Sequence, residues 1–173
     1  MLKEQTNIRL RKATPSDHAK IWEILQSAIL KRKNEGSKQW QQGYPNSDTV
    51  NNDISKQIGY VLEIDNQIAA YTALLFDIEP NYEVETVSWL TSGKYAVVHR
   101  VAVSPEFVGQ GIAKKLFVEL EDLVKSNNVF SIKVDTNFDN IPMLKILEKL
   151  QYQYCGEVLS NGSPRKAFEK VLI

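Results

Sequence analysis

Residues 101–116 read VAVSPEFVGQGIAKKL, and this stretch decides the fold prediction. An apolar segment typical of a strand ends at Val103, glycines follow at positions 109 and 111, and a helical pattern begins near Ile112. A turn that enters a helix in this way directs several backbone N–H groups toward one point, and the helix dipole adds positive potential there. The stretch therefore predicts a strand, a phosphate-binding turn and a helix.

The segments on either side of this stretch predict an α/β protein. The order of expected elements is β-α-α-β-β-β-α-β-α-β-β, which indicates a mixed sheet with helices on both faces. Strands are expected within residues 7–13, 59–76 (a hairpin that turns at Asp65–Gln67), 94–103, 129–136 and 154–173 (a pair around Asn161–Gly162). Helices are expected from Thr14 and Pro15 onward, over 49–57, from Ile112 onward with Leu116, Leu120 and Leu123 buried, and over 140–150.

Length and composition favour one globular domain. The chain has 173 residues and a hydrophobic fraction of 43%, so we expect a single domain over residues 1–173 with its core from about residue 7. Lysine plus arginine and aspartate plus glutamate both number 21, which gives no bulk charge to attract nucleic acid or an anionic membrane. Cys155 is the only cysteine, and no signal peptide or membrane span is evident, so we expect a cytoplasmic protein without a metal site.

Three stretches together resemble the GNAT superfamily of N-acetyltransferases: HRVAVSPEF (99–107), VGQGIAKKL (108–116) and DTNFDNIPMLKILEKLQY (135–152). The order of elements agrees as well, from about Asn7 to the end of the chain. The resemblance implies the acyl-coenzyme A N-acyltransferase fold, with a central, mostly antiparallel sheet. It also implies that the cofactor is acetyl-coenzyme A (acetyl-CoA).

The family pattern Gln/Arg-x-x-Gly-x-Gly/Ala falls on residues 108–113, so the resemblance implies that the amides of this turn hold the pyrophosphate of the cofactor. Val108 departs from the pattern, which predicts an altered affinity rather than a loss of binding. By resemblance the backbone of Val101 to Val103 pairs with the pantetheine arm. The cofactor-binding residues implied in this way are Val101, Val103, Gly109, Gln110, Gly111, Ile112, Ala113, Lys114 and Asn140.

Two other interpretations of the glycine turn compete with phosphate binding. A tight turn that only needs backbone freedom is one, and a dinucleotide-binding fold is the other. Lys114 and Lys115 favour an anion, because cations in the first turn oppose the helix dipole unless an anion lies nearby. A dinucleotide fingerprint needs a third glycine and an earlier position in the chain.

His99 is the candidate general base, because histidine readily accepts a proton near neutral pH. It lies on the expected strand where members of the resembled family often place this base. Strand alternation predicts that His99 shares a face with Val101 and Val103, and that Arg100 points to the opposite face. The structural alternative is a buried histidine bonded to a backbone carbonyl.

The segment around Asn140 carries one agreement with the family and one departure. Asn140 matches an asparagine that contacts the pantetheine or thiol end, and it is also a candidate helix N-cap. Seven residues later the family frequently has a tyrosine that protonates the leaving thiolate, but here the residue is Leu147. Tyr152, Tyr154 and Cys155 are candidate replacements, although tyrosines there are more often packing residues.

Acceptor recognition is expected in two segments that carry aromatic and acidic side chains, a combination suited to a cationic amine. The candidate residues are Trp40, Tyr44, Glu83 and Trp89. The alternative is a solvated acidic loop over a few hydrophobic anchors.

The motifs and the family resemblance predict an N-acetyltransferase that transfers an acetyl group from acetyl-CoA to a primary amine of a small molecule, peptide or protein. A non-catalytic acyl-CoA-binding module is the alternative that Leu147 favours and His99 disfavours. A structural oligomer with a vestigial turn is a third hypothesis. The expected partner is an amine substrate, without nucleic acid or membrane, and the sequence leaves open whether the protein is a homodimer.

Overall fold

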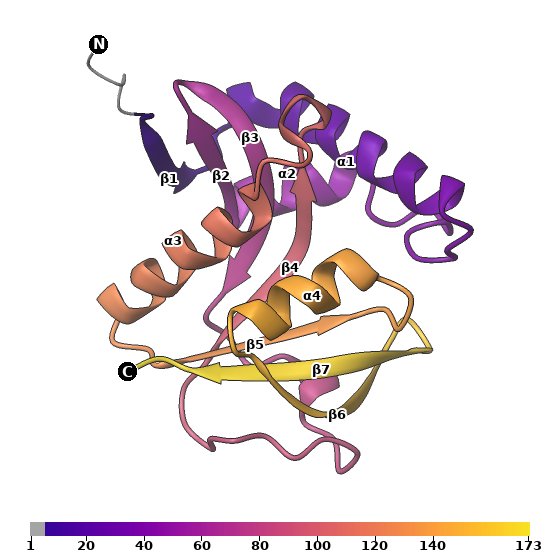
Figure 1. Cartoon of the computed structure of the whole chain (residues 1–173), viewed down its shortest axis with the longest axis vertical. Helices are drawn as coiled ribbons and strands as arrows, with labels where there is room; N and C mark the ends of the chain where they lie inside the picture. Colours follow the sequence, from indigo (N-terminus) through magenta and orange to yellow (C-terminus); the bar gives the residue numbers. More distant parts are fainter. Residues whose placement is uncertain (1–5) are drawn as a thin grey trace. The chain divides into compact units, whose positions relative to one another are not determined.

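The computed structural model describes residues 6–173 (Figure 1). Residues 1–5, part of the opening stretch in which no signal peptide is expected, lie outside the described residues. The strands are β1 (Ile8–Lys12), β2 (Gly59–Ile64), β3 (Gln67–Leu75), β4 (Ala96–Val103), β5 (Ser131–Thr136), β6 (Gln153–Ser160) and β7 (Ser163–Val171). The α-helices are α1 (His18–Asn34), α2 (Ser47–Ser55), α3 (Ile112–Ser126) and α4 (Ile141–Lys149), and short 3-10 turns are η1 (Pro15–Asp17), η2 (Pro80–Tyr82) and η3 (Pro105–Phe107).

The strands are hydrogen-bonded in the order β1-β2-β3-β4-β5-β7-β6. Strands β4 and β5 run parallel, whereas β1–β2, β2–β3, β5–β7 and β6–β7 are antiparallel. This arrangement confirms the predicted fold class, an α/β protein with a mixed, mostly antiparallel sheet. The predicted order of strands and helices is also confirmed.

The chain forms two compact units, and strand β4 contributes to both of them. Unit 1 contains the residues up to Ala73 together with Arg100–Leu116, and unit 2 contains Leu74–His99 together with Phe117–Ile173. The first unit therefore holds the glycine turn, and the second holds His99.

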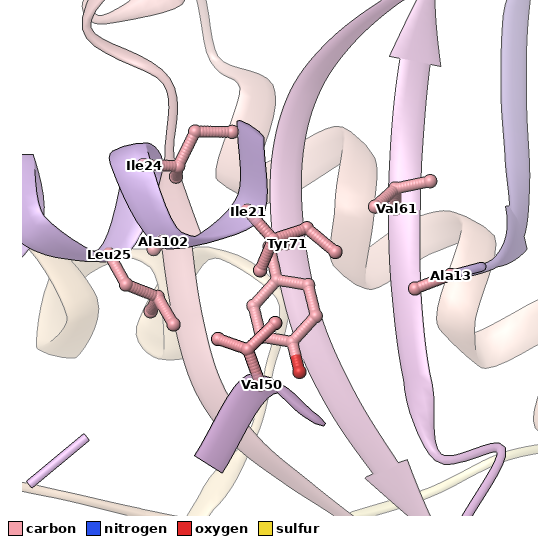
Figure 2. Packing of buried hydrophobic residues seen from close by; sticks show 8 residues of the cluster. All are labelled: Ala13, Ile21, Ile24, Leu25, Val50, Val61, Tyr71 and Ala102. Atoms are coloured by element: carbon pink, nitrogen blue, oxygen red, sulfur yellow. The ribbon is translucent and has the colours of Figure 1, made fainter. Parts of the chain in front are cut away.

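The core of unit 1 lies between the two N-terminal helices and their strands. Figure 2 shows Tyr71 of β3 beside Ile21 of α1 and Val50 of α2, and all three side chains are fully buried. Asn46 accepts a hydrogen bond from the backbone N–H of Thr49, so α2 begins two residues before the predicted start. The remaining members of the buried cluster are Ala13, Ile24, Leu25, Val61 and Ala102.

An ion-pair network joins the start of unit 1 to its sheet. Arg11 donates to Asp17 at 2.7 and 3.0 Å and to Glu63 at 2.9 Å, and the backbone N–H of Thr14 donates to Asp17 at 2.7 Å. Thr14 and Pro15 occupy the predicted cap and first position, although the first turn is a 3-10 helix. The hydrogen bonds from Arg11 lower the pKa of Asp17 from its ordinary 3.8 to about 2.

Asp17→Asn is expected to lower the free energy of unfolding by about 1–2 kcal/mol at pH 7. Because the folded pKa lies below the unfolded one, this stabilisation is present above the unfolded value and is lost as the pH falls toward 2. Urea unfolding at pH 7 and near pH 2 measures both effects. The control is Asp122→Asn, an exposed ion-pair partner of Lys125, and a loss as large in the control would contradict the assignment.

In unit 2, polar and apolar side chains alternate along β5, whose sequence is SIKVDT. Ser131, Lys133 and Asp135 contact side chains of β7 and of the connection between β3 and β4, so Ile132 and Val134 point to the other face. The buried face of α3 continues through Leu120 to Val124 rather than through Leu123, which is only partly buried.

Among residues 6–173, no helix is long and apolar enough to span a membrane. In the same residues no group of three or more histidine, cysteine, aspartate or glutamate side chains is arranged to hold a metal ion.

Candidate active site

The glycine turn of unit 1 has the backbone geometry of an anion cradle. Gly109 and Gly111 have φ values of +80° and +70°, which glycine adopts without steric cost. A Cβ atom built on either glycine meets no heavy atom within 4 Å, so the space beside the turn is open. Helix α3 begins directly afterward at Ile112, and its first-turn N–H groups have no acceptor within the helix. These features fit a phosphate group.

The side chains of residues 108–114 are exposed, partly or fully buried, or bonded within the turn itself. Val108 is 54% exposed, and the Gln110 side chain donates to the backbone oxygen of Glu106 at 3.3 Å. Ile112 is buried as the first apolar anchor of α3, whereas Lys114 is exposed in its first turn. Binding through backbone amides therefore needs nothing from the residue at position 108.

Strand β4 is irregular at Arg100. This residue has a φ of +55°, in the left-handed region, so the regular alternation of the strand is interrupted there. Arg100 and Ala102 both face α1 and α2, and Val101 and Val103 are partly buried. Arg100 and Ala102 thus share a face, as predicted for Arg100, and the common face of His99, Val101 and Val103 stays a prediction.

In unit 2, His99 is paired with a carboxylate. Its Nε2 atom lies 3.1 Å from Oε2 of Glu79, which stands just before η2. The His99 side chain is 24% exposed, so it is accessible to solvent rather than enclosed in the core. A carboxylate accepts hydrogen bonds and does not donate them, so Nε2 of His99 is the donor in this contact.

Two tyrosines fix the segment that carries Glu79. The hydroxyl of Tyr95 accepts from the backbone N–H of Glu79 at 3.0 Å and donates to Glu83 at 3.1 Å. The hydroxyl of Tyr82 donates to Asp135 at 2.5 Å, and the Tyr82 ring centroid lies 6.4 Å from that of His99. Burial first, and then the charge of Asp135, raise the pKa of Tyr82, so this hydroxyl stays protonated.

The ammonium group of Lys133 contacts two aromatic rings, those of Trp89 and Tyr95. Its Nζ atom is 4.4 Å from the centroid of Trp89 and 3.8 Å from that of Tyr95, and the residue is only 3% exposed. Burial lowers the pKa of Lys133. Trp89 also packs against Tyr82 and donates its Nε1–H to the Tyr82 backbone oxygen at 2.8 Å. The ring of Trp89 therefore anchors the connection between β3 and β4.

The two candidate acceptor residues of unit 1 lie in the connection between α1 and α2. Tyr44 is 40% exposed, and its hydroxyl accepts from Nη1 of Arg100 at 2.6 Å. Trp40 is partly buried, packs against the unit 1 core and has a φ of +63°. The side chains of Trp40 and Tyr44 thus anchor this connection in unit 1, whereas Glu83 and Trp89 belong to unit 2.

The chain matches the model of the acetyltransferase (GNAT) family over residues 19–152. It belongs to the GNAT family of acetyltransferases. The cofactor of this family is acetyl-CoA, so the predicted family and cofactor are confirmed. No match was found among curated proteins.

Solved GNAT structures have the same fold. A GNAT-family acetyltransferase from Streptococcus agalactiae is 32% identical with a TM-score of 0.87, and the alignment covers 96% of each chain. A putative acetyltransferase from Staphylococcus aureus is 25% identical with a TM-score of 0.71, covering 95% of this chain and 99% of that one. The putative acetyltransferase yncA from Salmonella typhimurium, solved with its cofactor acetyl-CoA, is 16% identical with a TM-score of 0.68 over 96% and 95% of the two chains.

The position of the GNAT tyrosine is occupied by a core residue. Leu147 of α4 is fully buried, and Asn140 caps this helix by accepting from the backbone N–H of Met143 at 3.4 Å. Tyr152 donates to Glu121 of α3 at 3.3 Å, and Tyr154 is exposed and packs on Phe168. Cys155 is buried among apolar side chains, and burial raises the pKa of its thiol. Tyr152 and Cys155 are thus buried, whereas the side chain of Tyr154 is exposed.

The sequence analysis assigned no individual role to Glu79, Tyr82, Tyr95, Lys133 or Asp135. The polar alternation in SIKVDT was the available signal for Lys133 and Asp135, since it marks a strand face with polar neighbours. No local pattern marks Glu79, whose partner His99 is 20 residues away.

Gly156 of β6 holds the connection between β3 and β4 in place. A Cβ atom here would lie 2.4 Å from the backbone oxygen of Thr86, and the φ of Gly156 is +135°. Beside it, the N–H of Ser88 donates to the oxygen of Cys155 at 2.8 Å, and the Thr86 hydroxyl donates to the oxygen of Glu157 at 2.7 Å. Only glycine allows this close approach.

Gly156→Ala is therefore expected to lower the free energy of unfolding by at least about 2 kcal/mol and to loosen residues 77–93. Thermal unfolding and limited proteolysis measure these effects. The matched control is Gly162→Ala in the β6–β7 turn, where φ is +74° and nothing lies within 4 Å of the added Cβ. Equal losses in the two variants would show that the close approach to Thr86 has no energetic importance.

Proposed function

We propose that this GNAT protein is an acetyl-CoA-dependent N-acetyltransferase that acetylates a primary amine of a small molecule, peptide or protein. The observation that carries the proposal is the pairing of His99, on strand β4, with Glu79, which precedes η2. A binding module needs no base, whereas amine acetylation requires that the amine lose a proton. The whole chain is proposed to act as one domain, which agrees with a family match that includes residues of both units.

The cofactor is proposed to bind through the backbone of unit 1. The amides of residues 109–114 bind its pyrophosphate, since the open space beside Gly109 and Gly111 leaves room for the phosphate oxygens. Val101 and Val103 contribute backbone hydrogen bonds to the pantetheine arm. The side chain of Asn140 contributes at the thiol end in addition to capping α4. Acetyl-CoA supplies an activated acetyl thioester, and the chain supplies the groups that bind and orient it.

His99 is proposed to accept the proton of the amine, directly or through one water molecule. The contact of Nε2 with Glu79 at 3.1 Å orients the imidazole ring that takes this proton. The Glu79 carboxylate then stabilises the imidazolium that forms. The thiolate needs no dedicated acid in place of Leu147, because a thiol with an ordinary pKa near 8.5 is a tolerable leaving group as its anion.

Acceptor recognition is proposed for Glu83 and Trp89 in unit 2, and for Tyr44 and Trp40 in unit 1. Glu83 is exposed on the segment that Tyr95 fixes, which leaves its charge accessible to an ammonium group. Tyr44 offers a half-exposed ring. Trp89 contributes by holding its segment, and Trp40 by holding the connection between α1 and α2.

Two measurements test the proposal in sequence. Acetyl-CoA at about one hundred times its dissociation constant should stabilise the protein by about 2.7 kcal/mol in a thermal-shift assay. Thiol release is then followed across a panel of small amines, polyamines and lysine peptides, and turnover with at least one is expected. Stabilisation without turnover on any amine would favour the acyl-CoA-binding module. A melting temperature that does not respond to acetyl-CoA would overturn both functions.

A further inference from the structure

The left-handed backbone of Arg100 lies in the middle of strand β4. Its φ of +55° contrasts with the value of roughly −120° to −140° of regular strand residues. A non-glycine residue adopts this conformation rarely and keeps it only where its surroundings hold it. Inside a strand, such a residue forms a bulge that changes the direction of the neighbouring peptide groups.

Three side chains of unit 1 hold Arg100 in this position. Asp53 of α2 accepts from Nε at 3.0 Å and from Nη2 at 2.6 Å, and Tyr44 accepts from Nη1 at 2.6 Å. Tyr71 of β3 donates a hydrogen bond to the same Asp53 carboxylate. The guanidinium is thus bonded at all three of its nitrogens, and its counter-ion is bonded in turn. We call these four residues the Arg100 network.

The Arg100 network is anchored in the core of unit 1. Asp53 is 3% exposed, and Tyr71 is fully buried beside Ile21 and Val50 (Figure 2). A closely packed core resists displacement, so these side chains set the position of the guanidinium rather than follow it. Through its side chain, Arg100 transmits that position to the backbone of β4.

We propose that Asp53, Tyr71 and Tyr44 are positioning residues that keep Arg100 left-handed and thereby aim the amides of residues 101–103 at the acyl-pantetheine arm. This inference rests on the proposed function, which assigns those amides to the cofactor. The network acts on these amides through the backbone, because Val101 directly follows Arg100 in the chain. Tyr44 joins the connection between α1 and α2 to the same guanidinium.

A pair of double variants tests this role. Asp53→Asn with Arg100→Ala and Asp53→Asn with Arg100→Gly both remove the whole ion pair, so neither leaves a buried charge unpaired. They differ only at the backbone, because glycine adopts a φ of +55° without steric cost and alanine does not. If the network serves to hold the bulge, the glycine variant should recover what the alanine variant loses.

Two readouts are measured on both variants. Amide resonances of residues 101–103 in the cofactor-free protein should stay near their wild-type positions with glycine and shift with alanine. The alanine variant should lose at least about tenfold in kcat, while its Kd for coenzyme A, held at the pyrophosphate, stays within about threefold. The glycine variant should recover most of that kcat. Equal spectra and equal kcat in the two variants would overturn the proposal.

The test remains informative if the chemistry or the folding fails. Absence of turnover in the wild-type protein would refute the proposed function, whereas the amide spectra of the two variants would still decide whether the network holds the bulge. If the alanine variant does not fold, Tyr44→Phe with Tyr71→Phe removes two hydroxyls from the network and adds no charge. Shifted amides of residues 101–103 are then expected, and wild-type spectra in this variant would overturn the proposal.

Discussion

Replacing His99 by glutamine is expected to lower kcat by about a hundredfold or more while leaving the Kd for acetyl-CoA unchanged. Glutamine preserves the size and polarity of the side chain but cannot take the amine proton at neutral pH. In the wild-type protein the rate should rise with pH on the acid side, because only the neutral imidazole accepts a proton. That limb of the kcat/KM profile should be absent from the variant.

The second histidine of the chain supplies a matched control. His18 lies in unit 1, where its Nε2 atom is 3.2 Å from the backbone oxygen of Ser47, and His18→Gln should retain the wild-type rate and pH profile. Glu79→Gln should lower kcat less than His99→Gln, because it weakens the orientation of the base without removing it. A near-normal rate and an unaltered pH profile in His99→Gln would exclude His99 from the mechanism.

Gly111→Val is expected to weaken acetyl-CoA binding by a factor on the order of 10 to 100, the loss that accompanies one or two charge-assisted hydrogen bonds. A branched Cβ fills the open space beside the turn and blocks the approach of phosphate to the amides. Valine also strains a backbone whose φ is +70°. Isothermal titration with acetyl-CoA measures the affinity.

The effect of strain is separated from that of the blocked approach by Gly162→Val. Gly162 has a φ of +74° and the same open surroundings, so this variant should lose similar stability and keep its affinity for acetyl-CoA. A folded Gly111→Val protein that binds acetyl-CoA as tightly as the wild type would show that the phosphate lies elsewhere.

The parts of the protein that sequence predicted well are those that depend on local interactions. The strand, turn and helix of residues 101–116 follow from apolar runs and from glycines at positive φ, which neighbours in sequence specify. The cap of α4 at Asn140 and the tight turn at Asn161–Gly162 follow from the same kind of short-range chemistry. The family resemblance rested on these segments, and the family match confirmed it.

The side chains that pair with His99 and Arg100 could be found only from the tertiary structure, because they lie far away along the chain. Glu79 reaches His99 from a connection without local periodicity, and Asp53 reaches Arg100 across 47 residues. The bulge at Arg100 was not predicted, since side-chain contacts rather than the preference of arginine hold its backbone left-handed. Amino-acid order by itself determined where the strand, the glycine turn and the candidate base lie. Only folding, which brings distant charges together, decided that Glu79 pairs with His99 and that Asp53 pairs with Arg100.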